Sequence, residues 1–341
     1  MGDGNGAGKI LVVDDTPANV DLLQGLLTRD GYVVQTAVNG EDALAAVARD
    51  APDLILLDVM MPKIDGFEVC RRLKQDPGTR LTPIVLLTSL QEREDKIQGI
   101  NAGADDFLTK PVNAQELRAR VRSLVRLKRY TDDLDSAESV IFSLAATIEA
   151  RDPYTQGHCQ RLAQYAVALG VHRDLRDDDL AALHRGGLLH DVGKVSVPDG
   201  ILLKPGPLTP DEYTVMQRHT VVGDTILGNL RSLRPVRPIV RHHHERLDGS
   251  GYPEGLRGDA IPLLAQIVGL VDVYDALTTD RPYRTALAPE QAYEELSAEA
   301  RKGWRDRVLV EDLIVLGRSS RLHQPAGSED LKRSLATWGR P

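Results

Sequence analysis

Residues 188–197 are Leu-Leu-His-Asp-Val-Gly-Lys-Val-Ser-Val, an apolar run that leads into an adjacent histidine and aspartate. Adjacent side chains on a helix point about 100° apart, so His190 and Asp191 can reach one metal ion only near a helix end or beside a cleft. Lys194 follows three residues later. The pair alone is weak evidence for a metal site, so its meaning depends on the rest of the chain.

Further imidazole and carboxylate groups occur on both sides of this pair. They are His158, His219, His243, His244 and Asp272. Seven candidate ligands exceed the four that a single zinc ion takes. Because a carboxylate can bridge, the set predicts two divalent ions about 4 Å apart, an arrangement that activates water for attack at phosphorus. Imidazole mixed with carboxylate suits iron, manganese, zinc or nickel. A core or surface position would be the better interpretation of any single histidine, but not of the cluster.

Length, charge and cysteine content limit the class of protein. A chain of 341 residues is too long for one ordinary core and predicts two domains. Without an apolar run of roughly 18 residues or a signal peptide, we expect a cytoplasmic protein that is not inserted in a membrane. Two cysteines, Cys70 and Cys159, agree with a reducing compartment. A net charge of −8 argues against the basic surface that DNA binding needs.

Short apolar runs alternate with helical periodicity between residues 9 and 125, after a Gly-rich stretch, 1–8, that predicts disorder. The apolar runs begin at Ile10, Tyr32, Leu54, Ile84 and Asp106. The alternation predicts a doubly wound α/β domain with a five-stranded parallel sheet. Functional groups in such folds gather at the carboxyl ends of the strands.

Those strand ends carry polar and charged side chains. They are Asp14, Asp15, Asp58, Thr88 and Lys110. Converging carboxylates repel one another unless a cation lies among them, and Mg²⁺ suits a site of few carboxylates with water and phosphate. Capping of the following helices is the alternative. Because the strand ends agree in type, we favour the magnesium site.

Two segments of this domain, Leu57-Asp-Val-Met-Met-Pro62 and Thr109-Lys-Pro111, resemble the receiver domain of two-component response regulators. The resemblance implies that Asp58 accepts a phosphoryl group from a cognate histidine kinase, as a nucleophile beside Mg²⁺. It also implies roles for Asp14 and Asp15 at the magnesium ion, for Thr88 and Lys110 at the phosphoryl group, and for Phe107 as the aromatic switch.

Residues 126–151 have the spacing of a charged linker helix. Leu127, Leu134, Ile141 and Ile148 recur every seven residues, and the first three are each followed by an apolar residue three positions later. This pattern of about three heptads predicts a dimerising signalling helix and hence a homodimer. A helix packed on its own domain is the competing interpretation.

Residues 152–318 predict an all-helical domain, because helical apolar spacing recurs and no alternating strand pattern occurs. The expected helices cover 161–170, 180–189, 212–227 and 262–277. Residues 319–341 predict a flexible tail with a short final helix at 331–338, in which His323 is solvated.

Four segments of the helical domain resemble the HD-GYP branch of the HD phosphohydrolases. They are His190-Asp-Val-Gly-Lys194, Leu203-Lys-Pro-Gly206, His243 to Pro253, and Asp280-Arg-Pro-Tyr-Arg284. With a receiver in front, the architecture is similar to response regulators that degrade cyclic di-GMP. The resemblance implies metal-dependent opening of that ring to pGpG, sometimes continuing to GMP. It also implies contacts between the Gly-Tyr-Pro motif and diguanylate cyclase-type partners.

The resemblance also assigns site residues position by position. One ion, iron or manganese by expectation, would take His158, His190, Asp191 and Asp272, and its neighbour would take His219, His243 and His244, with Asp191 bridging. Asp191 and Lys194 would be catalytic, and the substrate would contact Lys194, Gly251, Tyr252, Pro253, Arg281 and Arg284. We expect Asp275 to support its helix and His242 to be a bystander.

Departures from the family pattern refine these expectations. Tyr154 stands where some relatives carry a glutamate for a third ion, which favours two ions and pGpG as the product. Leu247 stands where a tryptophan is usual, and Arg284 replaces the commoner lysine. Two alternatives remain: a signalling adaptor that binds nucleotide or protein without turnover, and a phosphohydrolase of another nucleotide. The complete ligand set argues against the adaptor, because such a site has no physical need for so many costly polar groups.

Overall fold

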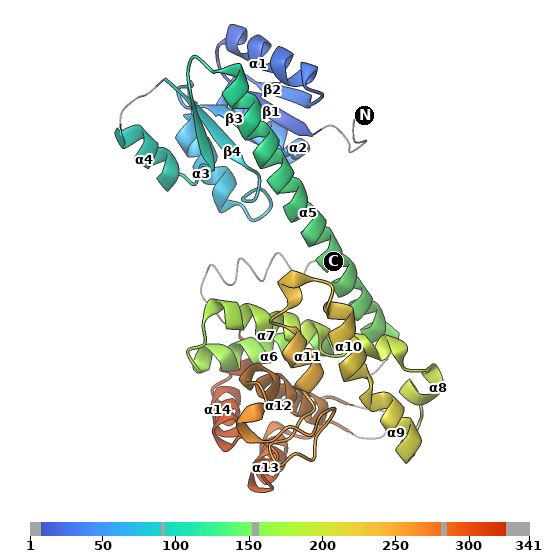
Figure 1. The fold of residues 1–341 in the computed structure, drawn as a ribbon. Coiled ribbons are helices and arrows are strands. Elements are labelled where there is room, and N and C mark those ends of the chain that lie inside the picture. Colours follow the sequence, from blue (N-terminus) through green and yellow to red (C-terminus); the bar gives the residue numbers. More distant parts are fainter. Residues whose placement is uncertain (1–7, 90–92, 152–156, 281–284, 325–341) are drawn as a thin grey trace. The chain divides into compact units, whose positions relative to one another are not determined.

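The computed structural model describes residues 8–89, 93–151, 157–280 and 285–324. The chain divides into two compact units, residues 1–136 and 137–341 (Figure 1). Within the described ranges, no helix combines the length and apolar character that a membrane crossing requires.

The first unit is a five-stranded parallel sheet with the strand order β2-β1-β3-β4-β5. Its strands are β1 (Lys9–Val13), β2 (Val33–Ala37), β3 (Leu54–Asp58), β4 (Ile84–Thr88) and β5 (Asp106–Thr109). The helices between them are α1 (Pro17–Arg29), α2 (Gly40–Arg49), α3 (Gly66–Gln75) and α4 (Arg93–Asn101). The predicted doubly wound α/β fold is confirmed.

Burial of both sheet faces explains why the central strands are apolar throughout. Leu11 and Val13 of β1 pack in a core with residues of α2 and α3, whereas Ile10 and Val12 pack in a second core with residues of α1. In register, Val13 lies beside Leu57 and Thr88 lies beside Thr109. The residues at these strand ends therefore meet at one edge of the sheet.

Gly8, which the sequence predicted to be disordered, pairs with the sheet. Val33 donates its backbone N–H to the carbonyl oxygen of Gly8 at 2.9 Å. Gly8 is thus tied to the sheet, so the prediction of disorder is wrong for this residue. Residues 1–7 lie outside the described ranges.

Helix α5 (Ala114–Arg151) has 38 residues, a length of about 57 Å at 1.5 Å per residue. Its early residues Leu117 and Val121 complete a core of the first unit. Its late residues Ala145 and Ile148 pack in a core of the second unit. One continuous helix therefore contributes to both cores.

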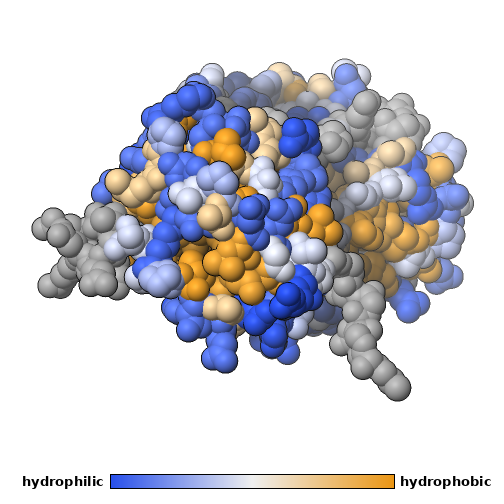
Figure 2. Space-filling model, turned by 90° about the horizontal axis from the view of Figure 1, so that it is seen from above, coloured by the Kyte–Doolittle hydropathy of each residue, from blue (hydrophilic) through white to orange (hydrophobic). Residues whose placement is uncertain are grey.

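The predicted heptad seam on α5 has two different environments. Leu127 and Tyr130 are 60% and 61% exposed, whereas Ile148 is only 4% exposed and packs within its own unit. Packing on its own domain thus explains the C-terminal end of the seam. Exposed apolar residues also occur on the first unit, including Leu22 and Met60, and Figure 2 shows apolar patches among hydrophilic side chains on one face.

The second unit is helical. Its helices are α6 (His158–His172), α7 (Asp177–Leu189), α8 (Asp199–Leu202), α9 (Pro210–Gln217), α10 (His219–Leu227), α11 (Arg237–His242), α12 (Leu263–Thr278), α13 (Pro289–Arg301) and α14 (Arg307–Arg318). The prediction of an all-helical domain is confirmed for the described residues, where pairing of the β type is limited to an isolated bridge between Asp248 and Arg257.

The single helix predicted over 212–227 is wrong, because α9 ends at Gln217 and α10 begins at His219. Arg218 separates the two helices. A one-residue break leaves the apolar spacing on both sides intact, so periodicity does not reveal it.

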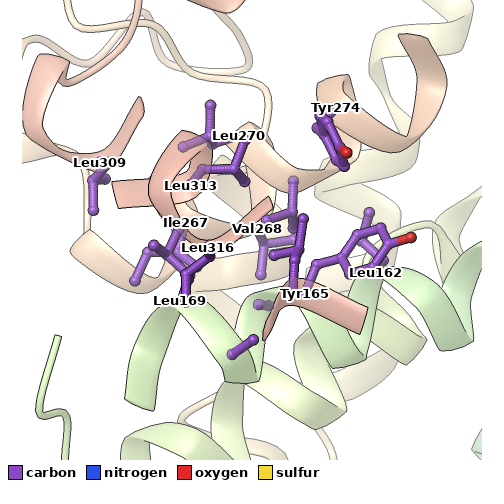
Figure 3. Close-up of a cluster of buried hydrophobic side chains, with 14 of the residues drawn as sticks. Leu162, Tyr165, Leu169, Ile267, Val268, Leu270, Tyr274, Leu309, Leu313 and Leu316 are labelled. Carbon is purple, nitrogen blue, oxygen red and sulfur yellow. The ribbon is translucent and has the colours of Figure 1, made fainter. Parts of the chain in front are cut away.

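Helices α6, α12 and α14 are among those of the second unit that meet around an apolar core (Figure 3). Leu162 and Leu169 of α6 contribute to it, together with Ile267 of α12 and Leu313 of α14, and all four are fully buried. This core fixes α6 and α12, the helices that carry His158 and Asp272.

The start of the predicted C-terminal tail is ordered. A short 3-10 turn, η4 (Arg321–His323), follows α14, and Leu322 within it is fully buried. The Oη of Tyr165 lies 3.2 Å from Nδ1 of His323. The prediction of a flexible segment is therefore wrong for residues 319–324, because Leu322 anchors them, whereas His323 is exposed to solvent as predicted. The helix predicted at 331–338 lies outside the described residues.

Candidate metal centre and receiver site

The candidate ligands of the second unit lie mostly at helix ends. His158 and His219 begin α6 and α10, and His190 is the C-cap of α7. At a helix end the backbone turns away, which allows adjacent residues such as His190 and Asp191 to face the same space. Asp272 differs, since it projects from within α12.

The structure brings all seven predicted ligands together in two neighbouring groups. Ligand atoms within a group lie within 4.8 Å of one another. We call them the first group, which is His158, His190 and Asp272, and the second group, which is Asp191, His219, His243 and His244.

Asp191 lies between the two groups. Its Oδ2 is 3.1 Å from Nε2 of His190 in the first group, and its Oδ1 is 3.3 Å from Nε2 of His219 in the second. One carboxylate oxygen faces each group. This is the arrangement that a bridging carboxylate requires.

Three ligand imidazoles are oriented by the same local contact. Nδ1 of His190, His219 and His243 lies 2.8–2.9 Å from the backbone carbonyl three residues earlier. That carbonyl accepts a hydrogen bond, so Nδ1 carries the proton and Nε2 has a free lone pair. Within the described residues, Nε2 of each of these buried rings has no hydrogen-bond partner. Buried acceptors without a donor fit metal ions, which would satisfy them.

Electrostatics favour neutral imidazoles beside ionised carboxylates. Burial lowers the pKa of His243 to about 3, and it also lowers the pKa values of His219 and His244. Burial alone would raise the pKa values of Asp191 and Asp272, but neighbouring histidines outweigh it and lower both. Neutral imidazole and ionised carboxylate are the forms that bind cations.

His158 is held by two carboxylates. Its Nδ1 lies 2.7 Å from Oδ2 of Asp275 and its Nε2 lies 3.3 Å from Oδ1 of Asp272. Arg161 donates to both oxygens of Asp275. Burial opposes protonation of His158, but the hydrogen bonds to both aspartates outweigh it and raise its pKa to about 10. A cation bound beside Asp272 would replace that proton.

The remaining candidates of the second unit surround these groups. Lys194 Nζ lies 2.5 Å from Oδ2 of Asp191. Tyr252, between Gly251 and Pro253, lies with its ring centroid 4.8 Å from that of His244. Glu245 stabilises this loop by accepting the backbone N–H groups of residues 254–256.

In the first unit, the strand ends carry a compact charged site. Lys110 Nζ lies 2.7 Å from Oδ2 of Asp14 and 2.8 Å from Oδ1 of Asp58. Asp14, Asp15 and Asp58 form a third group of candidate ligands. Burial raises the pKa of Asp58, although Lys110 partly offsets this effect. A cation beside these carboxylates would favour the ionised form.

Thr88 and Phe107, the predicted receiver switch residues, lie near the ends of neighbouring strands β4 and β5. Thr88 ends β4, and its backbone carbonyl accepts the N–H of Lys110 at 2.8 Å. Phe107 lies on β5 with its ring so close to Gly99 that a Cβ there would be 2.5 Å from it. Thr88 thus borders the acidic site, while the Phe107 ring packs against α4.

Comparison with known proteins gives two family matches. Residues 10–122 match the response regulator receiver domain, and residues 143–309 match the HD domain. A probable cyclic di-GMP phosphodiesterase of Vibrio cholerae is 37% identical over 319 residues, which cover 83% of this chain and 72% of that protein. The chain belongs to the response-regulator family that joins a receiver domain to an HD phosphodiesterase domain.

Two further relatives of this response regulator extend the comparison. The cyclic di-GMP phosphodiesterase response regulator RpfG of Xanthomonas campestris is 34% identical over 333 residues, covering 91% of this chain and 88% of that protein. The 3'3'-cGAMP-specific phosphodiesterase 3 of Vibrio cholerae is 36% identical over 183 residues, covering 53% of this chain and 40% of that protein. The chain is accordingly a response regulator and a phosphodiesterase.

Some sequence predictions for this response regulator are corrected or fall outside the described residues. Asp275 does more than support its helix, since its carboxylate orients the ring of His158. Sequence spacing pointed to the turn of α12 that carries Asp275 but not to this partner, which comes from α6. Arg281, Arg284 and Tyr154 lie outside the described residues.

Two residues beside the ligands do not join either group. His242 lies 3.1 Å from Oε2 of Glu254 and forms a separate group of candidate ligands with Glu245 and Glu254. Burial raises the pKa of the Cys159 thiol, which disfavours the thiolate that a metal would need.

Proposed function

We propose that this response regulator hydrolyses cyclic di-GMP to pGpG at the two ligand groups of its HD domain. The observation that carries the proposal is the position of Asp191 between the two groups, with Oδ2 facing Nε2 of His190 and Oδ1 facing Nε2 of His219. The names of the Vibrio and Xanthomonas relatives support this substrate.

Divalent ions in the two groups, by our proposal iron or manganese, would lower the pKa of a bound water and neutralise charge on the phosphate. The chain's own residues orient the reaction. Asp275 and three backbone carbonyls hold the imidazole rings in place. Lys194, which lines a pocket with His158 and Asp191, can reach a phosphate oxygen of the substrate. Tyr252 would pack against a guanine or ribose of the substrate.

We further propose that phosphorylation of Asp58 controls this activity. The carboxylate would attack the phosphoryl group that a cognate histidine kinase supplies, with Mg²⁺ held by Asp14, Asp15 and Asp58. Lys110, within 2.8 Å of both Asp14 and Asp58, is placed to bind a phosphoryl oxygen. Thr88 would contact the same group.

The exposed part of the α5 seam supports a homodimer. Leu127, Tyr130 and Leu134 are each at least 48% exposed. Two copies that pair along these residues would bury the apolar stripe in a short coiled coil. A contact between the loop around Tyr252 and a diguanylate cyclase-type protein is a further proposed interaction.

A second substrate deserves a direct comparison because one relative is named as specific for 3'3'-cGAMP. Purified full-length protein loaded with Mn²⁺ would be incubated with each cyclic dinucleotide, and the products identified by chromatography and mass spectrometry. We expect cyclic di-GMP to yield pGpG, and His190→Ala to abolish the reaction. Preferential cleavage of 3'3'-cGAMP would show that this nucleotide, and not cyclic di-GMP, is the substrate. Binding of both nucleotides without any hydrolysis would favour the adaptor alternative.

A further inference from the structure

Helix α5 contributes a wall to a pocket that two of the candidate ligands, His158 and Asp191, also line. The residues that line this pocket include Ala145, Ile148 and Glu149 from α5, and His158, Asp191 and Lys194 from the ligand region. The helix that begins in the receiver unit therefore ends beside the metal centre.

Glu149 makes a polar contact with the start of α6. That helix begins at His158 after Gly157, which has a left-handed backbone and no side chain to cap the helix. The first N–H groups of a helix have no partner within the helix. Oε1 of Glu149 accepts the backbone N–H of Cys159 at 3.1 Å. A carboxylate also complements the positive N-terminal end of the helix dipole.

We propose that Glu149 is a positioning residue for the first group, and that it transmits a movement of α5 to His158. By holding the first turn of α6, Glu149 fixes the distance of His158 from Asp272, whose Oδ1 is 3.3 Å away. The inference rests on the proposed function only in taking the first group to be an ion site.

The apolar contacts of α5 reach helices around both groups, whereas two of its glutamates make polar contacts with α6 and α7, helices of the first group. Glu138 of α5, which is 2% exposed, lies with Oε2 at 3.8 Å from the guanidinium of Arg185 on α7, and α7 leads into His190. Charged side chains of α5 therefore contact both helices that lead to histidines of the first group. Ala145 and Ile148 of α5 share an apolar cluster with Leu227 of α10 and Val240 of α11, and also with Leu189, the residue before His190. Apolar contacts tolerate sliding better than a directed hydrogen bond does.

The test is a Mn²⁺ binding isotherm of the metal-stripped full chain, because it needs no substrate. Binding at the receiver carboxylates is common to wild type and every variant, so the comparison concerns the two ions of the HD domain. We expect Glu149→Ala to lower the affinity for one of the two ions roughly ten-fold and to leave the affinity for the other unchanged. A loss of about ten-fold is the lower end of the loss in metal affinity when a group that supports a ligand is removed. Glu149→Gln keeps an oxygen that can accept the N–H of Cys159, so only the charge is lost. The affinity for the same ion should then fall only about three-fold. Glu295→Ala, an exposed carboxylate on α13, is the matched control and should bind both ions like wild type.

Two results would overturn the proposal. One is that Glu149→Ala binds both ions with wild-type affinity. The other is that the affinities for both ions fall equally, as a general destabilisation of the domain would cause. Circular dichroism checks the fold of each variant. Should Glu149→Ala not fold, Glu149→Gln decides, since unchanged affinity for both ions rejects the role of the carboxylate. If wild-type protein does not cleave cyclic di-GMP but the isotherms still differ at one ion, the substrate is wrong and the role of Glu149 stands.

Beryllofluoride, which mimics a phosphoryl group on Asp58, tests whether Glu149 transmits a movement of α5 to His158. It should change the affinity of the same single ion in wild type and have little effect in Glu149→Ala. An equal change in both proteins would contradict transmission through this residue.

Discussion

Asp191→Asn should remove the thermal stabilisation that divalent ions give this protein, whereas Asp272→Asn should remove about half of it. The difference follows from position. Asp191 offers one oxygen to each group, 3.1 Å from His190 and 3.3 Å from His219. Asp272 belongs to the first group alone.

The size of the effect follows from mass action. An ion present at 100 times its Kd that binds only the folded chain stabilises it by about 2.7 kcal/mol, so two ions give about 5.4 kcal/mol. The second unit comprises residues 137–341. A domain of roughly 200 residues shifts its Tm by about 2–4 °C per kcal/mol. Wild type should therefore melt about 11–22 °C higher with Mn²⁺, Asp272→Asn by about half of that, and Asp191→Asn by about 3 °C or less.

Differential scanning calorimetry of each full-length variant, stripped with a chelator and then reloaded with Mn²⁺, measures these shifts. Each variant is compared with its own metal-free form, so an effect of the substitution on the empty chain cancels. If Asp191→Asn retained half of the wild-type shift, as Asp272→Asn does, Asp191 would serve one ion only and the bridging arrangement would be refuted.

Three other outcomes are expected. Gly269→Ala should weaken Mn²⁺ binding, because an added Cβ would lie 2.1 Å from the carbonyl oxygen of His243, and a wild-type isotherm would contradict this. Asp58→Asn should make hydrolysis insensitive to beryllofluoride, which should change turnover of wild type; a response that persists would place the phosphoacceptor elsewhere. His184→Gln should reduce the loss of folding stability that wild type suffers at acidic pH. Burial lowers the pKa of His184 to about 4, so the unfolded chain binds that proton more tightly, and between pH 7 and pH 5 wild type should lose up to about 2 kcal/mol more than the variant. Urea unfolding at both pH values measures the loss, and equal losses would exclude a buried neutral His184.

The sequence was sufficient to predict the receiver site because parallel strands impose its geometry. Once Ile10 and Leu54 begin buried strands, Asp14 and Asp58 must emerge at the same edge of the sheet. The clustering of the seven candidate ligands in the second unit was predictable for another reason. Seven costly imidazole and carboxylate groups need a common partner, whatever the path of the chain between them.

The orientation of the ligands was less accessible from sequence. The carbonyl three residues before His190 or His243 holds the ring only because the helix ends there, and apolar spacing does not fix helix ends to one residue. The same weakness hid the break at Arg218, which frees the carbonyl of Met216 for His219. A helix end at each ligand is the local signal that would have revealed these contacts.

Contacts between distant helices had no sequence signal. Asp275 meets His158 across 117 positions, and Glu149 reaches Cys159 from a different helix. The tail illustrates the same limit, because Leu322 lies in a polar segment, yet its burial orders the turn around it. In each case the partner is determined by packing of the helical core and not by spacing along the chain.

Anomalous diffraction at the manganese edge, from crystals of the Mn²⁺-loaded protein, tests most directly whether two ions share one pocket. Apart from an ion at the receiver carboxylates, the account predicts two peaks in the HD domain of each chain, one among His158, His190 and Asp272 and one among His219, His243 and His244, with Asp191 touching both. A single peak, or two peaks that Asp191 does not join, would contradict it.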